Sequence, residues 1–341
     1  MILFHNPIVK GEDVPYSYRA RAIIPAKNIG SEAKIIKKVQ EAQENDIVVL
    51  SKKHTIEDRK WLKSMNIDFI MDVSDDKFNT HSSIWNATIG DAVAVTTTCQ
   101  HLKQVVIDKT KKSEHLIHVI EDPTEREQEP PKFSPGKRAK VVWYGSYKNY
   151  RELYFPWIRK ALNTIYPTDV RVITNYKNQK KKYGKDYRLN NIYLLTAELK
   201  QMVTDELDKQ FDLMEQWTYR LQGEAVRESD IVFLPTPTNK PWQVAKGNNR
   251  PVDAIRQGRL VIMNPGTPSW DSLREYCYNG NCIEGYQWAM NKNNREEIYK
   301  RITEGQKFIE ENYSPKAIGR IIDYLLIMLL DFIKHIIGLL S

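Results

Sequence analysis

Cysteine is scarce in this sequence, and the motifs that depend on it are missing. The 341 residues include three cysteines, Cys99, Cys277 and Cys282, whose spacing matches neither a metal site nor a disulfide framework. A few cysteines without a disulfide pattern are typical of proteins in a reducing compartment. The first five residues also lack the basic region and the long apolar core of a signal peptide. We therefore expect a cytoplasmic protein without a cysteine-based metal site.

Long uninterrupted apolar runs are missing as well. Residues 318–340 are mostly isoleucine and leucine, but Arg320, Asp323, Asp331 and Lys334 recur along them. Charges spread in this way exclude a membrane-spanning segment and predict a helix with a wide apolar face and a narrow polar one. We expect this helix to pack against the body of the protein. The alternatives are a peripheral contact with a membrane and an oligomer interface.

The charge balance indicates an anionic partner. The formal net charge is +8, which favours the phosphates of a nucleotide, a nucleic acid or an anionic membrane surface. Residues 176–188 interleave lysines with tyrosines. This composition suits nucleic acid, but it is also typical of a solvated loop.

Strand-like and helix-like segments alternate along the first 122 residues. Short runs rich in valine and isoleucine predict strands at 21–25, 46–51, 68–73, 91–96 and 115–121. Apolar residues at helical spacing predict helices at 31–43 and 55–65. Repeated β-α-β units of this length imply a parallel sheet with helices on both faces.

A second unit follows a break in this pattern. Residues 121–136 are charged, rich in proline and without apolar period, which is typical of a linker. The same alternation then restarts, with strands predicted at 139–144, 169–174, 192–196, 230–234 and 260–263, and helices predicted at 150–165, 213–227, 270–276 and 295–312. We therefore divide the chain into a first domain (1–122), a linker (123–138), a second domain (139–313) and a terminal helix (314–341).

The segment between the last two predicted strands carries the most informative side chains. Lys246, Asn249, Arg250 and Asp253 fall in a polar loop and at the start of the short helix that follows it. A helix N-terminus presents free N–H groups and a positive dipole, so it is a natural site for a diphosphate. The alternative is an ordinary solvated loop of an α/β protein.

A glycine turn follows the first predicted strand of the second domain. The sequence there is Val-Val-Trp-Tyr-Gly-Ser at 141–146. Gly145 allows the backbone to approach a phosphate closely, and the Ser146 hydroxyl is able to donate a hydrogen bond to it.

Three segments in this order, at 141–146, 228–235 and 246–258, resemble the donor-binding domain of nucleotide-sugar glycosyltransferases with the GT-B fold. The resemblance implies an α/β fold of two Rossmann-like domains that face a cleft. It implies a UDP- or GDP-sugar as donor, no further cofactor and no metal, because arginine and lysine neutralise the diphosphate. Many retaining members carry two glutamates seven residues apart here, where this chain has Lys246 and Asp253. Asp253 is then the counterpart of the carboxylate that binds the ribose, and the stereochemical outcome stays open.

The first domain is expected to bind the acceptor. Asp72 lies near the carboxyl end of a predicted strand and His81 follows shortly after it, so either one is a candidate base for the acceptor hydroxyl. The alternative is that Asp75 and Asp76 cap the next helix and that His81 lies on the surface.

Several functions fit these features. The first is a metal-independent glycosyltransferase whose acceptor is a glycan or a lipid-linked saccharide. The others are a transferase that modifies DNA at a hydroxylated base, as some phage enzymes do, a non-enzymatic protein that binds a sugar or nucleotide, and a sugar-nucleotide epimerase.

Overall fold

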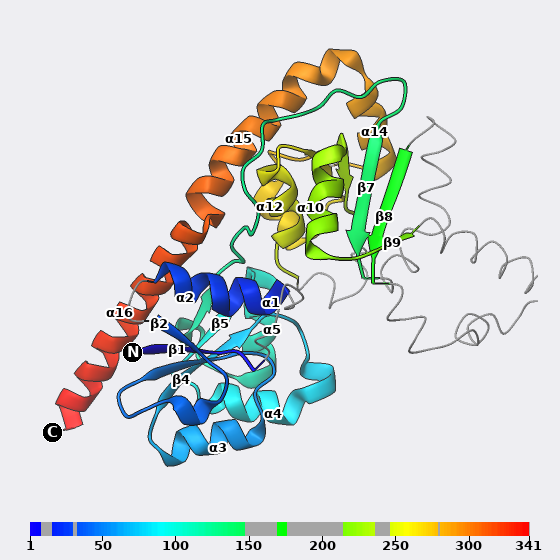
Figure 1. Ribbon diagram of the computed structural model, residues 1–341. Helices are drawn as coiled ribbons and strands as arrows, with labels where there is room; N and C mark the ends of the chain where they lie inside the picture. Colours follow the sequence, from blue (N-terminus) through cyan, green and yellow to red (C-terminus); the bar gives the residue numbers. More distant parts are fainter. Residues whose placement is uncertain are drawn as a thin grey trace, which may run out of the picture.

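The computed structural model contains two parallel β-sheets, each flanked by helices (Figure 1). It describes residues 1–7, 16–29, 33–146, 169–175, 214–235, 246–278 and 280–340. The first sheet has the strand order β2-β1-β3-β4-β5-β6 and the second has the order β11-β10-β7-β8-β9. The expected fold of two Rossmann-like domains is therefore confirmed.

The first sheet is built from short apolar strands that all pair in parallel. Its strands are β1 (Ile2–His5), β2 (Ala33–Ile36), β3 (Ile47–Leu50), β4 (Asp68–Val73), β5 (Ala94–Thr97) and β6 (Ile117–Val119). Strands β1, β3 and β5 are buried along their whole length, as expected for parallel strands covered on both faces. The four strands from β3 to β6 lie where the sequence predicts them.

Two predictions near the N-terminus are wrong. The segment 21–25, expected as a strand, is helical, in the π-helical turn η1 (Arg19–Ile23) and α2 (Ile24–Asn28). The segment 31–43, expected as a helix, contains β2 and the short 3-10 helix η2 (Val39–Glu41). Periodicity does not separate short apolar runs of the two kinds. Strand β1, which was not predicted, supplies the hydrogen bonds that make β2 a strand.

Helices cover both faces of the first sheet. The remaining ones in this domain are α1 (Tyr16–Tyr18), α3 (Ile56–Ser64), α4 (Phe78–Asp91), α5 (Gln100–Thr110) and η3 (Glu114–Leu116). Helix α3, which was predicted, is capped by Thr55, whose side chain forms a capping box with that of Asp58. Helices α3, α4 and α5 bury Leu62, Trp85 and Leu102 in one core. Helix α2 packs in the core on the opposite face.

The second domain repeats the plan. Its elements are β7 (Lys140–Gly145), β8 (Asp169–Thr174), β9 (Met214–Gln216), α10 (Tyr219–Glu228), β10 (Ile231–Phe233), α12 (Asn249–Arg256), β11 (Leu260–Ile262), α13 (Pro268–Leu273), α14 (Cys282–Met290), η6 (Lys292–Asn294) and α15 (Arg295–Tyr313). The helix predicted at 213–227 is correct only from Tyr219 onward, because β9 occupies its start. The helix predicted at 150–165, the strand predicted at 192–196 and the lysine- and tyrosine-rich segment at 176–188 lie outside the described residues.

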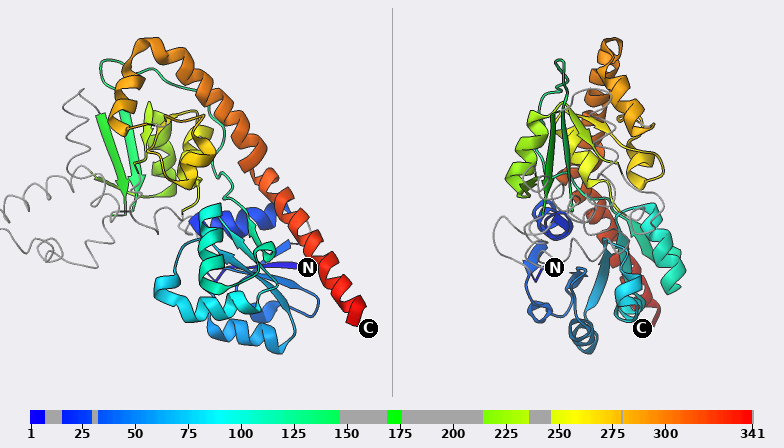
Figure 2. Two further views of the ribbon diagram at one scale, coloured as in Figure 1. Left: turned by 180° about the vertical axis from the view of Figure 1, so that it is seen from behind. Right: turned by 90° about the vertical axis from the view of Figure 1, so that its right-hand side faces the viewer.

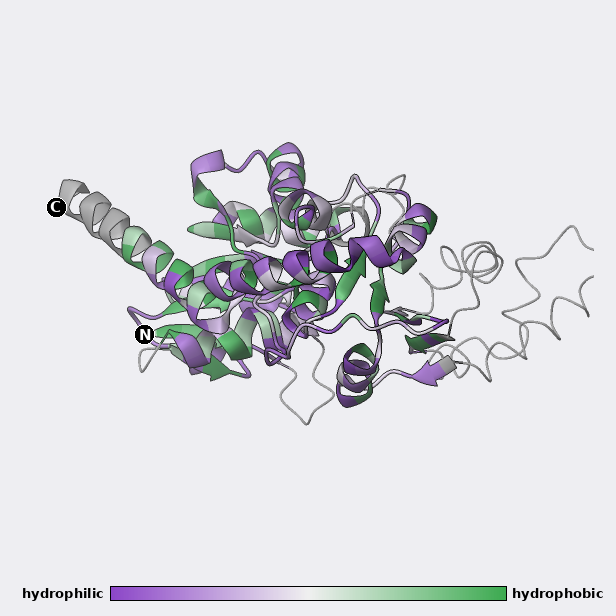
Figure 3. Cartoon of the chain, turned by 90° about the horizontal axis from the view of Figure 1, so that it is seen from above, coloured by the Kyte–Doolittle hydropathy of each residue, from purple (hydrophilic) through white to green (hydrophobic). Residues whose placement is uncertain are grey.

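The last helix returns to the first domain. Helix α15 belongs to the second domain and ends at Tyr313, and α16 (Pro315–Leu340) continues past the first domain (Figures 1 and 2). Ile318, Ile322 and Leu325 of α16 are buried in the core that contains β1 and α2, as the packed-helix interpretation of this segment expects. Among the described helices, none is long and apolar enough to cross a membrane. Figure 3 shows most strands in green, which marks hydrophobic residues, and the helices around them in a mixture of green and the purple of hydrophilic residues.

The linker is fixed against the end of α12. The N–H of Glu129 donates to Arg256 O at 3.2 Å, and the N–H of Lys132 donates to Gly258 O at 2.9 Å. Gly258 follows α12 with φ +71°, and a Cβ atom there would lie 2.3 Å from Pro130 O. Only glycine fits this position without strain.

We expect Gly258→Ala to lower the midpoint of thermal unfolding. The left-handed backbone alone costs a residue with a Cβ about 1–3 kcal/mol, and the clash with Pro130 adds to that. Gly136→Ala in the same linker is the matched control, since a Cβ there meets no atom within 4 Å. Equal midpoints for the two variants would contradict the tight packing of the linker on α12.

Candidate functional site

A pocket of about 260 Å³ lies where the linker, the first domain and the second domain meet. Its lining residues are Tyr16, Arg19, Glu125, Arg126, Tyr144, Gly145, Ser146, Asn175, Trp217, Tyr219, Gln222, Asn249, Arg250 and Asp253. Five of the six residues expected to bind the donor are therefore brought together here. The sixth, Lys246, lines a smaller adjoining pocket that shares Arg250.

The pocket follows the carboxyl edge of the second sheet. Gly145 ends β7, Asn175 follows β8 and Trp217 follows β9. Helix α12 begins after β10, which neighbours β7 in the sheet. The carboxyl edge of parallel strands is where open α/β sheets bind their ligands.

Arg250 lies in the first turn of α12 and contacts the end of β7. Its guanidinium donates to Tyr144 O at 3.3 Å, and the Tyr144 hydroxyl donates to Arg250 O at 2.9 Å. Burial lowers the pKa of this guanidinium. None of the ion pairs found among the described residues involves Arg250. A cation that is partly desolvated and lacks a carboxylate at the start of a helix attracts an anion.

Gly145 makes room for this guanidinium. A Cβ atom on Gly145 would lie 3.4 Å from Nη1 of Arg250 and 3.0 Å from the ring of Trp143. The glycine therefore allows the turn after β7 to lie against the arginine, and Ser146 lines the pocket next to it.

Asp253 is buried one turn further along α12. Its Oδ1 accepts hydrogen bonds from the Thr124 hydroxyl at 2.9 Å and from the N–H of Glu125 at 3.1 Å. Burial raises the pKa of the Asp253 carboxyl to about 7, and the charge of Glu125 contributes to the rise. No described residue donates a hydrogen bond to Oδ2, so this oxygen is available to a ligand hydroxyl.

The linker and the first domain supply residues that the sequence did not reveal. Arg19 and Glu125 form a bidentate pair with both N···O distances at 2.8 Å. The guanidinium of Arg126 lies 3.7 Å from the ring centroid of Tyr219 and donates to Tyr219 O at 2.8 Å. Arg126 belongs to a segment that composition identified only as a spacer. The one available signal was an arginine beside acidic residues, which is common in solvated linkers.

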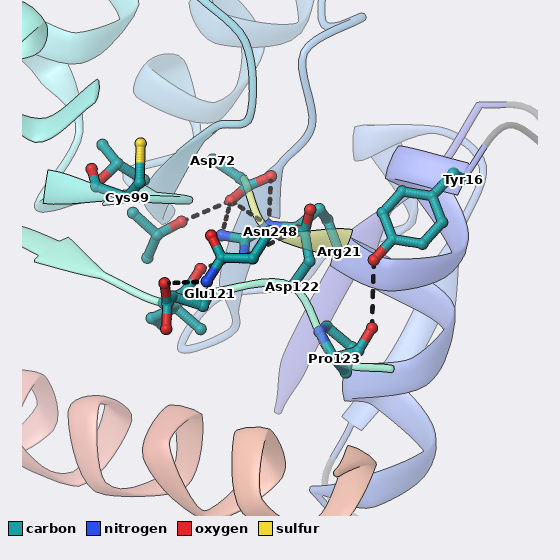
Figure 4. Close-up of polar contacts among 11 residues, drawn as sticks. Tyr16, Arg21, Asp72, Cys99, Glu121, Asp122, Pro123 and Asn248 are labelled. Carbon is teal, nitrogen blue, oxygen red and sulfur yellow. Dashed lines mark hydrogen bonds and ion pairs between the residues drawn. The ribbon is translucent and has the colours of Figure 1, made fainter. Parts of the chain in front are cut away.

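Asp72 is not the free base that its position suggested. Its carboxylate accepts from Nε of Arg21 at 3.0 Å and from the Thr96 hydroxyl at 2.7 Å (Figure 4). Asp122 approaches the same guanidinium at 3.5 Å. All three ionic side chains are buried, so Asp72 is held in an ion-paired cluster. His81 lies on α4, and its side chain is not among those described.

Glu121, which follows strand β6 of the first sheet, forms a hydrogen bond with the loop that precedes α12. It accepts a hydrogen bond from the Asn248 amide at 2.7 Å (Figure 4). The same amide donates to the Tyr313 hydroxyl at 2.8 Å. Asn248 directly precedes α12 and Tyr313 ends α15. The start of α12 is therefore anchored to both domains. Within the described residues, no group of three or more histidine, cysteine or acidic side chains is placed to hold a metal ion.

No family model and no curated protein matches the sequence, but solved structures match the fold. Anabaena HepE, in complex with UDP and glucose, aligns over 95% of this chain and 98% of its own with a TM-score of 0.61 and 12% identity. The E. coli trehalose-6-phosphate protein bound to UDP-2-fluoro glucose aligns over 84% of this chain and 74% of its own, with a TM-score of 0.57 and 12% identity. TarM aligns with a TM-score of 0.57 and 11% identity over 84% of this chain, which spans 55% of TarM. The chain has the GT-B glycosyltransferase fold.

Proposed function

We propose that this protein transfers a sugar from a nucleoside-diphosphate sugar to an acceptor hydroxyl without a metal ion. The observation that carries the proposal is Arg250, a desolvated cation without a described carboxylate partner at the start of α12. It lines a pocket at the carboxyl edge of the second sheet, and Tyr16 and Arg19 of the first domain line the same pocket. The neighbours in fold that hold UDP or a UDP sugar support the same chemistry.

The pocket residues have distinct tasks in this proposal. Arg250 and the N–H groups of α12 bind the diphosphate next to Gly145, and Asp253 accepts a hydrogen bond from a ribose hydroxyl. As the bond between the sugar C1 and the diphosphate oxygen breaks, negative charge grows on that oxygen and Arg250 stabilises it. The acceptor oxygen forms the new bond to C1 and releases its proton to solvent, and the nucleoside diphosphate leaves. Lys246 stays a candidate donor residue through the adjoining pocket.

For the acceptor we propose a glycan or a lipid-linked saccharide. Helix α16 exposes large apolar side chains, at Ile321, Tyr324, Ile327 and Met328. Such side chains suit a peripheral contact with a membrane that carries the acceptor. Binding to vesicles of phosphatidylcholine and phosphatidylglycerol, compared with binding to duplex DNA at increasing salt, separates this acceptor class from a DNA acceptor.

A metal-free thermal-shift panel tests the function. We expect nucleoside diphosphates and their sugars to raise the unfolding temperature, because a ligand at 100 times its Kd adds about 2.7 kcal/mol to the stability. The absence of any shift would refute the proposal. Binding without sugar transfer to any acceptor would favour a binding protein, and isomerisation of the sugar without an acceptor would favour an epimerase.

The affinity for UDP-glucose is expected to depend on pH through Asp253. An ionised carboxylate accepts a hydrogen bond from a ribose hydroxyl more strongly than a protonated carboxyl does, and the pKa of Asp253 is about 7, so the Kd should fall as pH rises from 6 to 8. Protein stability should change in the opposite direction. A carboxyl whose pKa is raised by folding stabilises the protein at low pH and loses that contribution as pH rises through 7. Calorimetric titration from pH 6 to 8 should give a Kd for UDP-glucose that does not change with pH in Asp253→Asn. A pH dependence of the Kd that persists in this variant would exclude Asp253 as its source.

A further inference from the structure

Trp217 and Gln222 lie at the end of the pocket opposite Arg250. The lining runs along neighbouring strands, from α12 after β10, past Gly145 at β7 and Asn175 after β8, to Trp217 after β9. Adjacent strands are about 4.8 Å apart, so the two ends are separated by roughly 14 Å. If the proposed function holds, a diphosphate at Arg250 directs the nucleobase toward Trp217 and Gln222.

The side-chain amide of Gln222 has a fixed orientation. Gln222 lies in the first half of α10, and its Oε1 accepts a hydrogen bond from the indole Nε1 of Trp217 at 2.7 Å. An indole N–H donates and never accepts. The amide oxygen must therefore face Trp217, and the NH₂ group points away from it.

The NH₂ group of Gln222 is available to a ligand. Gln222 lines the pocket, and no described residue accepts a hydrogen bond from its Nε2. This end of the pocket therefore presents two N–H donors from an amide whose acceptor oxygen is already engaged. A ligand that places a carbonyl oxygen here gains a hydrogen bond, whereas a ligand that places an amino group here leaves two donors facing each other.

We infer that Gln222 selects a nucleobase with a keto group at its Watson–Crick edge. Uracil presents O4 and guanine presents O6, where cytosine and adenine present amino groups. The donor is then a uridine or guanosine diphosphate sugar, and cytidine and adenosine diphosphates bind roughly tenfold more weakly or worse, in line with the penalty for an unsatisfied donor. The inference deepens the proposed function and rests on it.

Two variants separate this assignment from a general effect on the pocket. Gln222→Glu keeps one oxygen for the indole of Trp217 and turns a second acceptor toward the base, so the preference should reverse in favour of CDP and ADP. Trp217→Phe removes the N–H that fixes the amide. The amide is then free to rotate, so the preference for UDP over CDP should shrink to near unity while both nucleotides still bind.

The test measures the Kd of UDP, CDP, GDP and ADP for the wild type and both variants by calorimetry. Arg220→Ala is the control on the same helix, since the Arg220 side chain is 84% exposed and lies outside the pocket lining. Circular dichroism melting of each ligand-free variant confirms folding. Equal affinity of the wild type for all four nucleotides, or an unchanged preference in Gln222→Glu, would overturn the inference and leave the proposed function intact. Failure of every nucleotide to bind the folded wild type would instead refute the proposed function.

Discussion

Arg250→Ala is expected to lower kcat/KM for sugar transfer by about 10²–10³-fold, the loss typical of removing one group that stabilises a developing oxyanion. The guanidinium lies at the start of α12 beside the turn at Gly145. Its positive charge stabilises the diphosphate in the ground state, and this stabilisation becomes stronger as the bond to the sugar breaks. The variant should therefore lose most of its affinity for UDP, while its weak binding of uridine, which has no phosphate, stays the same.

The same substitution should leave the ligand-free protein as stable as the wild type or more stable. Burial lowers the pKa of Arg250, which means that the folded protein disfavours the charged form. Removal of a desolvated cation that pairs with no carboxylate among the described residues relieves this penalty. A loss of function without a loss of stability is the signature of a binding residue, because a structural arginine would lose both together.

Calorimetry with UDP and uridine, together with thermal unfolding without ligand, measures both effects. Arg250→Lys should recover part of the affinity, because lysine keeps the charge but not the planar fork. Arg220→Ala, which removes an exposed arginine from the neighbouring helix α10, should bind like the wild type. If Arg250→Ala binds UDP as tightly as the wild type does, the diphosphate is not at this helix.

The sequence could predict the second domain better than the pocket as a whole. Gly145 could be found because it ends a strand, and Arg250 and Asp253 could be found because they lie near the start of a helix that follows another strand. A parallel sheet brings the carboxyl ends of its strands to one edge. Arg19 and Arg126 could not be identified as pocket residues from the sequence. Both reach the pocket through contacts across more than ninety residues, to Glu125 and to Tyr219 respectively, and no local periodicity encodes a contact of that kind.

The wrong strand at 21–25 has a related cause. The short apolar run Ala-Ile-Ile at 22–24 resembles a buried strand, with Arg21 as a polar residue at its boundary. In the fold, Arg21 is buried and its guanidinium bonds Asp72 and Ile120 O. The helical backbone of η1 positions the arginine for that cluster, so tertiary contacts outweigh the local pattern.

Arg21→Met is expected to destabilise the protein by about 3–5 kcal/mol, the range measured when one partner of a buried ion pair is removed. The substitution leaves Asp72 and Asp122 buried without their cation and leaves Ile120 O without its donor. The chain offers a matched control in Arg59→Met. Arg59 pairs with Asp91, but both side chains are more than a fifth exposed, so this substitution should cost about 1 kcal/mol or less.

The loss of stability in Arg21→Met should also depend on pH. Burial raises the pKa of Asp122 to about 6 even with Arg21 present, because desolvation outweighs the attraction of the arginine. A carboxyl whose folded pKa lies above its unfolded value stabilises the fold fully at low pH, and this contribution is lost as pH rises through the folded pKa. Without the guanidinium, Asp122 should hold its proton to still higher pH. The deficit of Arg21→Met relative to the wild type should therefore be larger at pH 8 than at pH 5, as measured by urea unfolding.

Asp72→Asn separates the two roles that have been considered for this carboxylate. If Asp72 were the base for the acceptor, the variant would stay stable and lose turnover. If Asp72 is the partner of Arg21, as the contacts indicate, the variant should unfold at lower urea concentration, and its folded fraction should keep most of its kcat. An inactive but fully stable Asp72→Asn, together with a deficit of Arg21→Met that does not change with pH, would restore Asp72 as the base.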